Sequence, residues 1–217
     1  MKTYGQWCSV AKALDVVVQR WSLLLVRELF DGPKRYSDLL EGSPGVSTDV
    51  LAARLRDLEA DGVITRRTLP PPAASKVYEL TARGRELAPV LGALSRWGMQ
   101  LLGERGEDEE FRPQWLATGL RGLLRPSWAK DVVLEIDFAL APDEVVRIHV
   151  EGGRLDAVAE PDGAPDVVVH GELELLADLA DGSVRVEDAL ADGRLAFEGG
   201  DDDIRAFQRL FPQPVSS

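Results

Sequence analysis

The apolar residues of this chain follow two different spacings, and the change between them limits the folds that the chain can adopt. In the first half they recur every three or four residues, which is the spacing of one helix face. From Asp131 to Leu140 they alternate instead with polar or small residues, which is the pattern of a half-buried strand. Since 217 residues exceed the usual size of one domain, the sequence predicts a mainly helical domain followed by an α+β domain.

The charges divide at about the same place. Residues 1–103 carry 14 basic and 11 acidic side chains, a net charge of +3, whereas residues 104–217 carry 11 and 26, a net charge of −15. Affinity for nucleic acid rests on neutralising phosphates, so only the first half is suited to bind it. We predict a first domain over 1–103, an acidic linker with an amphipathic helix over 104–127, and a second domain over 128–217.

Several classes of protein are disfavoured by what the sequence lacks. No stretch stays apolar over the ~20 residues of a membrane span, and the first ten residues lack the apolar run of a signal peptide. We therefore expect a cytoplasmic protein without a membrane partner. One cysteine and two isolated histidines, His149 and His170, give no metal-ligand spacing, so no metal or other cofactor is expected. No paired carboxylates or nucleophile stand out, so an enzyme is not expected.

The strongest local signal is the segment from Ser47 to Gly62. Ser47 is a typical N-cap, and Gly62 is a typical helix stop. Between them three leucines share one face, while small side chains and Arg56 share the other, which suits the major groove of DNA. Arg54 lies near the buried edge and is expected to pair with an acidic residue of its own chain. The residues predicted to contact DNA from this segment are Ser47, Thr48, Asp49, Ala52, Ala53 and Arg56.

A hairpin is predicted next. The runs VITRRTL and SKVYELT are rich in β-branched and aromatic residues and are joined by a proline-rich loop. Arg66, Arg67 and Lys76 concentrate positive charge on this hairpin. We therefore predict that these three side chains contact DNA as well.

A long helix is predicted from Thr81 to Leu102, with an apolar stripe along it. An apolar face of this length either completes the core of its own protomer or meets a partner chain, and we predict a dimer interface. The stripe consists of Leu87, Val90, Leu91, Leu94, Trp97 and Leu101.

The order of these elements is that of a winged helix-turn-helix. The segments CSVAKALDVV, RWSLLLVRELFDGPKRYSDL, PGVSTDVLAARLRDLEADGVITRR and YELTARGRELAPVL resemble the HxlR family of transcription regulators, relatives of the MarR regulators, over most of residues 8–98. The resemblance implies a homodimer on an inverted-repeat operator in double-stranded DNA, with the helix from Ser47 in the major groove and the hairpin against the backbone or minor groove. Many members have a Pro-Asn pair where this chain has Thr48 and Asp49. Because Asp49 can only accept hydrogen bonds, the base preference of relatives does not carry over.

Cys8 matches the position of an N-terminal cysteine in redox- and electrophile-sensing members of that family, in which thiol modification changes DNA binding. The resemblance therefore implies a redox sensor at Cys8, and a place near a helix N-terminus would lower its pKa. The alternative is that Cys8 only packs, because cysteine is among the residues most often buried.

The second half resembles the sterol carrier protein type domain over residues 128–211. The segments PDVVVHGELELLADLADG, VRVEDALADGRLAFEGG and DIRAFQRLF carry the resemblance. In that family a sheet and helices enclose an apolar cavity for lipids or other hydrophobic small molecules, so the resemblance implies a ligand-sensing domain. The alternative is that the same side chains fill a core. The residues predicted to line a cavity are Trp115, Leu116, Trp128, Ile136, Phe138 and Val150.

Together these features predict a transcription regulator whose first domain binds DNA under the control of a hydrophobic effector in the second. Two alternatives stay open. In one, the chain is a lipid-binding or transfer protein and the winged helix serves only for assembly. In the other, the chain is a regulator but its trigger is the thiol of Cys8.

Overall fold

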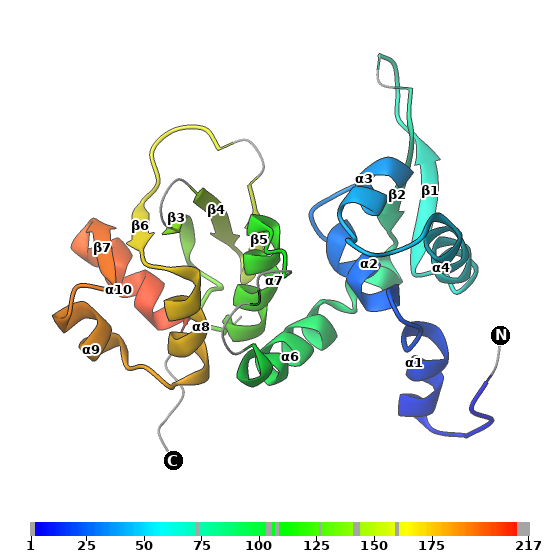
Figure 1. The fold of residues 1–217 in the computed structure, drawn as a ribbon. Coiled ribbons are helices and arrows are strands. Elements are labelled where there is room, and N and C mark those ends of the chain that lie inside the picture. The colour runs from blue at the N-terminus through cyan, green and yellow to red at the C-terminus, as the bar shows by residue number, and fades with distance from the viewer. Residues whose placement is uncertain are drawn as a thin grey trace. The chain divides into compact units, whose positions relative to one another are not determined.

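The computed structural model describes residues 3–72, 74–102, 106, 109–125, 127–140, 144–158 and 161–211. The chain forms two compact units, which divide between Ala88 and Pro89 (Figure 1). Among the described residues no helix is long and apolar enough to cross a membrane. In the same ranges no three His, Cys, Asp or Glu side chains gather in a way that could hold a metal ion.

The first unit is a winged helix-turn-helix, as the sequence predicts. Its two strands pair antiparallel into a hairpin that extends beyond the helices (Figure 1), and backbone hydrogen bonds between Lys34 and Tyr78 add a third short pairing. The elements are α1 (Ser9–Val17), α2 (Ser22–Leu29), α3 (Tyr36–Glu41), α4 (Thr48–Ala60), β1 (Ile64–Thr68), β2 (Lys76–Leu80) and α5 (Ala82–Arg85).

The core of the first unit lies where α2, α3 and α4 meet the hairpin. The apolar side chains on the inward faces of these helices become buried, and each contributes roughly 1.5–3 kcal/mol to folding. The most deeply buried are Leu25, Val26, Leu39, Leu51, Leu55, Leu58 and Ile64.

The predicted helix from Thr81 to Leu102 is wrong in one respect, because it is not continuous. After α5 the chain breaks, and α6 (Ala88–Gly98) begins anew before a short 3-10 turn, η1 (Met99–Leu101). Pro89 accounts for the break, since it lacks the N–H that would donate to the carbonyl four residues earlier in a continuous helix. The compact units divide after the first residue of α6, whereas the sequence analysis ended its first domain at residue 103.

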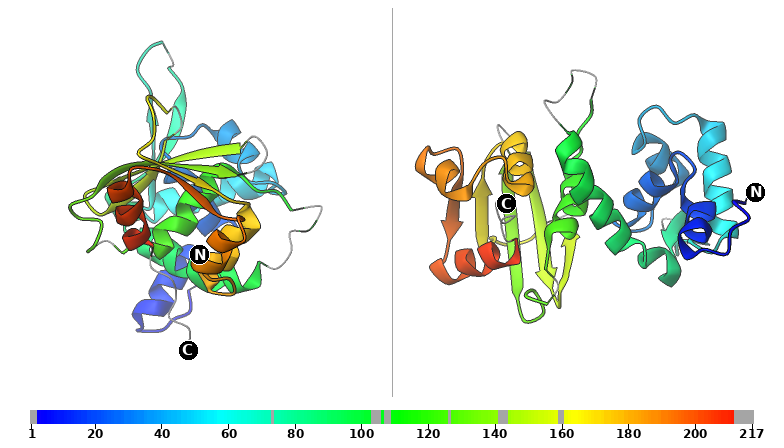
Figure 2. Two further views of the ribbon diagram at one scale, coloured as in Figure 1. Left: turned by 90° about the vertical axis from the view of Figure 1, so that its left-hand side faces the viewer. Right: turned by 90° about the horizontal axis from the view of Figure 1, so that it is seen from below.

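The second unit is an α+β fold, also as predicted. Its sheet has the order β5-β4-β3-β6-β7, in which β3 and β6 run parallel and the other neighbours run antiparallel. Helices gather on one face of this sheet (Figure 2). Besides α6 and η1 the elements are α7 (Pro113–Leu123), β3 (Val133–Leu140), β4 (Glu144–Glu151), β5 (Arg154–Ala157), β6 (Val167–His170), α8 (Leu173–Asp181), α9 (Val186–Ala191), β7 (Ala196–Gly199) and α10 (Asp201–Leu210).

The alternating apolar residues of β3 form the sheet side of the core of the second unit. Their side chains are at most 3% exposed, whereas the residues between them lie on the other face of the sheet. Helices α7, α8 and α10 cover the apolar face with Ala117, Leu120, Leu175, Leu179, Phe207 and Leu210.

Candidate nucleic-acid interface

Helix α4 is held at its beginning by two side chains. The Ser47 hydroxyl accepts a hydrogen bond from the Val50 N–H at 3.4 Å, which satisfies one of the free donors of the first turn. The Tyr36 hydroxyl of α3 donates to the Thr48 carbonyl at 2.8 Å. Sequence reasoning identified Ser47 but missed Tyr36, because a tyrosine at the start of a short helix gives no sign of a distant acceptor. Both contacts fix the N-terminal end of α4.

The outward face of α4 is formed by the residues that the sequence assigned to it. Ser47, Thr48, Asp49 and Arg56 are exposed, and Ala52 and Ala53 are half-buried. The guanidinium of Arg56 folds along its own helix, where Nε donates to the Ala52 carbonyl at 3.2 Å. Arg56 has no ion pair with any residue that the structure describes, so its charge is available to a ligand.

Arg54, by contrast, is paired within its own helix. Its guanidinium lies 3.0 Å from the Asp57 carboxylate, at the i and i+3 positions of α4. The expectation of an intramolecular partner for Arg54 is thus confirmed, and this side chain is a poor candidate for DNA contact.

The hairpin presents its three cations differently. Arg67 donates to the Glu79 carboxylate at 2.7 Å, and Arg66 lies 4.0 Å from Glu59. Lys76 is exposed and has no ion pair within the described ranges. The charges of Arg66 and Arg67 are therefore partly neutralised by carboxylates of the chain itself. Lys76 is the cation of the hairpin best placed for a phosphate.

The predicted dimer stripe is exposed along α6 and η1, with one exception. Val90, Leu94, Trp97 and Leu101 are 43–69% exposed, which is unusual for apolar side chains of this size. Leu91 is only 8% exposed and is packed inside its own protomer. Leu87, which precedes the break before α6, is half-buried.

A second exposed apolar stripe, which the sequence analysis did not single out, lies on the first unit. Trp7 is fully exposed, and Val10, Leu14 and Val18 of the α1 region are 36–64% exposed. Ala11 and Val17 instead face the core. The helical spacing of Val10 and Leu14 was visible in the sequence, but it could not tell the buried face of α1 from the exposed one.

The side of α6 opposite its stripe packs on α7. Gly92 and Gly122 let the two backbones come close, since a Cβ added to Gly92 would lie 2.9 Å from the Gly122 Cα. Arg96 donates to the Gly122 carbonyl at 2.6 Å and secures the crossing. Helix α6 thus belongs to the second unit while it carries most of the predicted dimer stripe.

Three of the residues predicted to line a ligand cavity lie in the core. Ile136, Phe138 and Val150 are at most 2% exposed inside the core, where the Phe138 ring meets the Phe207 ring edge to face at 6.0 Å. Trp115 and Leu116 are half-buried on α7.

Two surface hollows of the second unit lie elsewhere. Trp128 lines the smaller one, of about 410 Å³, and the guanidinium of Arg125 stacks over its ring at 4.8 Å. A larger hollow, of about 880 Å³, opens beside Leu140, Val145 and Leu175. Alternation in the sequence predicted which side chains turn inward, but it could not tell a filled layer from a hollow one.

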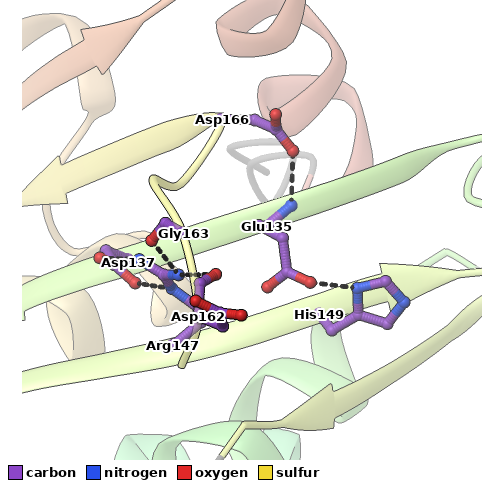
Figure 3. A network of polar contacts seen from close by, with 7 residues as sticks. All are labelled: Glu135, Asp137, Arg147, His149, Asp162, Gly163 and Asp166. Atoms are coloured by element: carbon purple, nitrogen blue, oxygen red, sulfur yellow. Dashed lines mark hydrogen bonds and ion pairs between the residues drawn. The ribbon is translucent and has the colours of Figure 1, made fainter. Parts of the chain in front are cut away.

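The outer face of the sheet carries a connected polar network (Figure 3). The Arg147 guanidinium makes two hydrogen bonds to the Asp137 carboxylate, at 2.6 and 2.7 Å, and Nη1 donates to the carbonyls of Asp162 and Gly163. The hydrogen bonds to Asp137 raise the pKa of Arg147 despite its burial. Arg147 is only 6% exposed, so the network fastens the segment after β5 across this face.

The two histidines are not isolated, which corrects the sequence analysis. His149 Nδ1 lies 2.7 Å from Glu135, and Nε2 lies 3.5 Å from Glu151. Burial lowers the pKa of His149, but hydrogen bonds to both carboxylates outweigh it, and the pKa is raised. His170 Nε2 lies 3.1 Å from Glu198. Glu151 lies two residues from His149 in β4, whereas Glu135 and Glu198 lie on neighbouring strands, and the register that brings these two to the histidines is not visible in the sequence.

Comparison with known proteins identifies the first part of the chain. Residues 16–105 match the HxlR-like helix-turn-helix family. An HTH-type transcriptional regulator of Synechocystis is 43% identical over 45% of this chain and 73% of its own length. The chain belongs to the HxlR-like helix-turn-helix family.

Other transcriptional regulators match about the same share of the chain. The Bacillus subtilis regulators YvaP and YodB are 38% and 34% identical over 41% of this chain, which is 82% and 79% of their own lengths. Among solved structures, the regulator YtcD is 33% identical over 45% of this chain and 99% of that chain, with a TM-score of 0.41. The reduced form of YodB is 30% identical over 46% of this chain and all of that chain, with a TM-score of 0.40.

Residues 129–212 of this HxlR-like regulator match the SCP-2 sterol transfer family. Both predicted resemblances are thus confirmed, and so is the prediction of a transcription regulator at the level of the family. The curated relatives are named as transcriptional regulators.

In this HxlR-like chain Cys8 is exposed at the N-cap of α1. The backbone N–H groups of Ala11 and Val10 favour the thiolate and lower the pKa of Cys8. The alternative that this side chain only packs in the protomer is not supported by its exposure.

Proposed function

We propose that the chain is a homodimeric transcription regulator that inserts α4 of each protomer into the major groove of an inverted-repeat operator, and that a hydrophobic small molecule in the second unit controls this binding. The outward face of α4 is the observation that carries the proposal. Its leucines are buried, its start is fixed by Ser47 and Tyr36, and Arg56 stands on the exposed side without an ion pair in the described chain.

Each residue of that face has a role that follows from its chemistry. Arg56 carries the donors that guanine accepts in the major groove, and the methyl groups of Ala52 and Ala53 suit a thymine methyl. Asp49 only accepts, so it suits the amino group of cytosine and disfavours a nearby phosphate. The ammonium group of Lys76 on the hairpin contacts a phosphate of the DNA backbone.

The second copy of the chain is the proposed partner of the exposed apolar stripes. Leu94, Trp97 and Leu101 on α6 and η1, with Trp7 and Val10 beside α1, present large apolar side chains to solvent. Isologous pairing of two copies would bury them and set two copies of α4 on one operator. Half-sites separated by about one helical turn of DNA are expected from this symmetry.

The packing of α6 on α7 supplies the link to an effector. The helix that carries the stripe is fastened to the second unit through Gly92, Gly122 and Arg96. A small molecule that shifts α7 would therefore shift α6 and change the dimer. Such a ligand changes DNA affinity only if it binds more tightly to one of two dimer arrangements, the one that can bind the operator or the one that cannot. The free energy that couples the two binding events is typically about 1–3 kcal/mol.

Arg56→Ala is expected to weaken binding to the operator by about 1–3 kcal/mol and to leave binding to random DNA nearly unchanged, because a base contact is lost. Lys76→Ala should weaken binding to the operator and to random DNA alike. It should also lower the slope of log affinity against log salt concentration by about one. Electrophoretic mobility shifts with the intergenic DNA upstream of the gene would measure both effects. Equal losses on the two DNAs for Arg56→Ala would place another side chain at the bases.

The same titration decides between regulation and lipid transfer. If the folded, dimeric protein binds no double-stranded site even at low salt, the winged helix serves only for assembly and the lipid-transfer alternative stands. Regulation is supported if the parent chain binds the operator, if Arg56→Ala weakens binding to the operator alone, and if Lys76→Ala weakens binding to both DNAs.

Replacing Leu94 and Trp97 together by glutamate is expected to yield monomers, because charges would enter the buried stripe of the dimer. Light scattering gives the mass directly. Val133→Glu is a matched control, since Val133 is 63% exposed on a strand outside the stripe. Leu91 is left unchanged because it packs inside the protomer. A double variant that stays dimeric would move the interface elsewhere.

Cys8 carries the second candidate trigger. Its exposure and its lowered pKa favour modification of the thiol by oxidants or electrophiles. The rate of alkylation by iodoacetamide, followed against pH, should show a midpoint below the ordinary value of about 8.5. Operator binding should then change on treatment with a quinone in the parent chain and not in Cys8→Ser. A midpoint at the ordinary value, or equal responses, would remove Cys8 as a trigger.

A further inference from the structure

A hollow of the second unit lies at one end of its sheet. The hollow measures about 880 Å³ and is lined where β3 and β6 end, where β4 begins, and by the first turn of α8. This volume falls within the usual range of small-molecule sites, roughly 300–1,000 Å³. None of the residues that the sequence analysis assigned to a ligand lines it.

The floor of this cleft is apolar. Leu140 and Leu175 are 3% and 5% exposed and line the cleft from the buried core, so the cleft borders the layer between sheet and helices. Val145 stands on the wall and is 59% exposed, although it lies in a strand. Val145 and Leu140 point to opposite faces of the sheet, so a hydrocarbon group that contacts both lies across the end of the sheet.

The rim of the cleft is negatively charged. Glu144 and Glu172 line it, and neither forms an ion pair with a described residue. Arg194 is the one cation among the described residues that line the cleft, and its guanidinium lies 2.7 Å from the Asp192 carboxylate. His170, also on the rim, is occupied by Glu198. The charges without a partner at the cleft are thus those of two carboxylates.

We infer that this cleft binds an amphipathic organic cation, with its apolar body on Leu140, Val145 and Leu175 and its positive group between Glu144 and Glu172. The inference rests on the proposed effector function and names the chemical class of the effector. A fatty acid of the same length would bring a carboxylate against two others and is selected against.

The test compares probes that share one chain length and differ in charge. Calorimetry of the full chain with dodecyltrimethylammonium and dodecanoate, below their micellar concentrations, should show at least about tenfold tighter binding of the cation. Tetramethylammonium, which has the charge without the hydrocarbon, should bind far more weakly. Equal affinity for the cation and the anion, or equal affinity for the long and the short cation, would overturn the assignment.

Variants locate the site. Glu144→Gln combined with Glu172→Gln should remove the preference for the cation. Glu144→Gln alone and Glu151→Gln alone provide a matched pair, because each deletes one carboxylate, at opposite ends of β4, and only Glu144→Gln should weaken the preference. A preference that survives in the double variant would show that the cation binds elsewhere.

Operator binding, measured with and without the cation, separates this inference from the proposed function. If the cation binds through Glu144 and Glu172 but operator affinity does not change, the cleft assignment stands and the effector role fails. If operator affinity responds equally in the parent chain and in the double variant, the effector role stands and the cleft assignment fails.

Discussion

Arg147→Met is expected to lower the free energy of unfolding of the second unit by about 3–5 kcal/mol, the largest single effect that the structure predicts. The substitution leaves the Asp137 carboxylate, which is 14% exposed, without its cation. It also removes the donor shared by the carbonyls of Asp162 and Gly163. A buried charge that loses its partner keeps its full desolvation cost, which is why the loss exceeds the strength of a surface ion pair.

Two further variants separate this explanation from a general intolerance of the sheet. Asp137→Val combined with Arg147→Met removes both charges of the pair. The loss in free energy of unfolding should therefore be smaller than in Arg147→Met alone. Arg154→Met removes an arginine that is 78% exposed and lies 3.9 Å from Asp156, and should change stability by less than about 1 kcal/mol. Urea unfolding of the full chain, followed by circular dichroism, measures all three. A double variant as unstable as Arg147→Met would contradict the account.

The network around Arg147 also shows where sequence reasoning stops. The alternation along β3 places Asp137 on the face opposite the core, and the register of β3 with β4 sets Arg147 directly across from it. Such a face is usually exposed to solvent. Here the carbonyls of Asp162 and Gly163, on a segment without regular structure, come over it and bury the guanidinium. Nothing in the pattern of the strands predicts that cover.

The DNA-binding element was more accessible to prediction, because its determinants are local. An N-cap serine, a repeat of leucines and a glycine stop lie within one stretch of sequence and define α4 on their own. Tyr36 holds the same helix from α3, and this contact depends on how the two helices pack. Local signals therefore predicted the element, whereas the contact that orients it required the structure.

The crossing of α6 and α7 is a second contact that the sequence conceals. The apolar stripe on α6 predicted a partner for one face of the helix, and the structure places α7 against the other. The signal was present as Gly92 and Gly122, since glycine in a helix interior is unfavourable unless close packing requires it. Glycines 30 residues apart give no indication that they meet.

Gly122→Ala is expected to destabilise the second unit by about 1–3 kcal/mol, because the added Cβ would run into the backbone carbonyl of Gly92. A backbone atom cannot rotate away, so α6 and α7 must separate. The hydrogen bond from Arg96 to the Gly122 carbonyl would weaken with them. Amide hydrogen exchange along α6 should accelerate, and urea unfolding should give the loss in free energy.

Gly119→Ala is the matched control, one helical turn earlier in α7, and its effect should have the opposite sign. A Cβ there would lie 3.7 Å from the Ser95 Oγ and 3.8 Å from the Met99 Cε, which is ordinary contact. Alanine is favoured over glycine inside a helix by about 0.5–1 kcal/mol, so this variant should be slightly more stable than the parent chain. Because α6 carries the proposed dimer stripe, Gly122→Ala should also weaken operator binding, while Gly119→Ala should leave it unchanged. If both variants gain stability, the two helices do not cross at Gly92, and α6 cannot transmit the state of the second unit to the dimer.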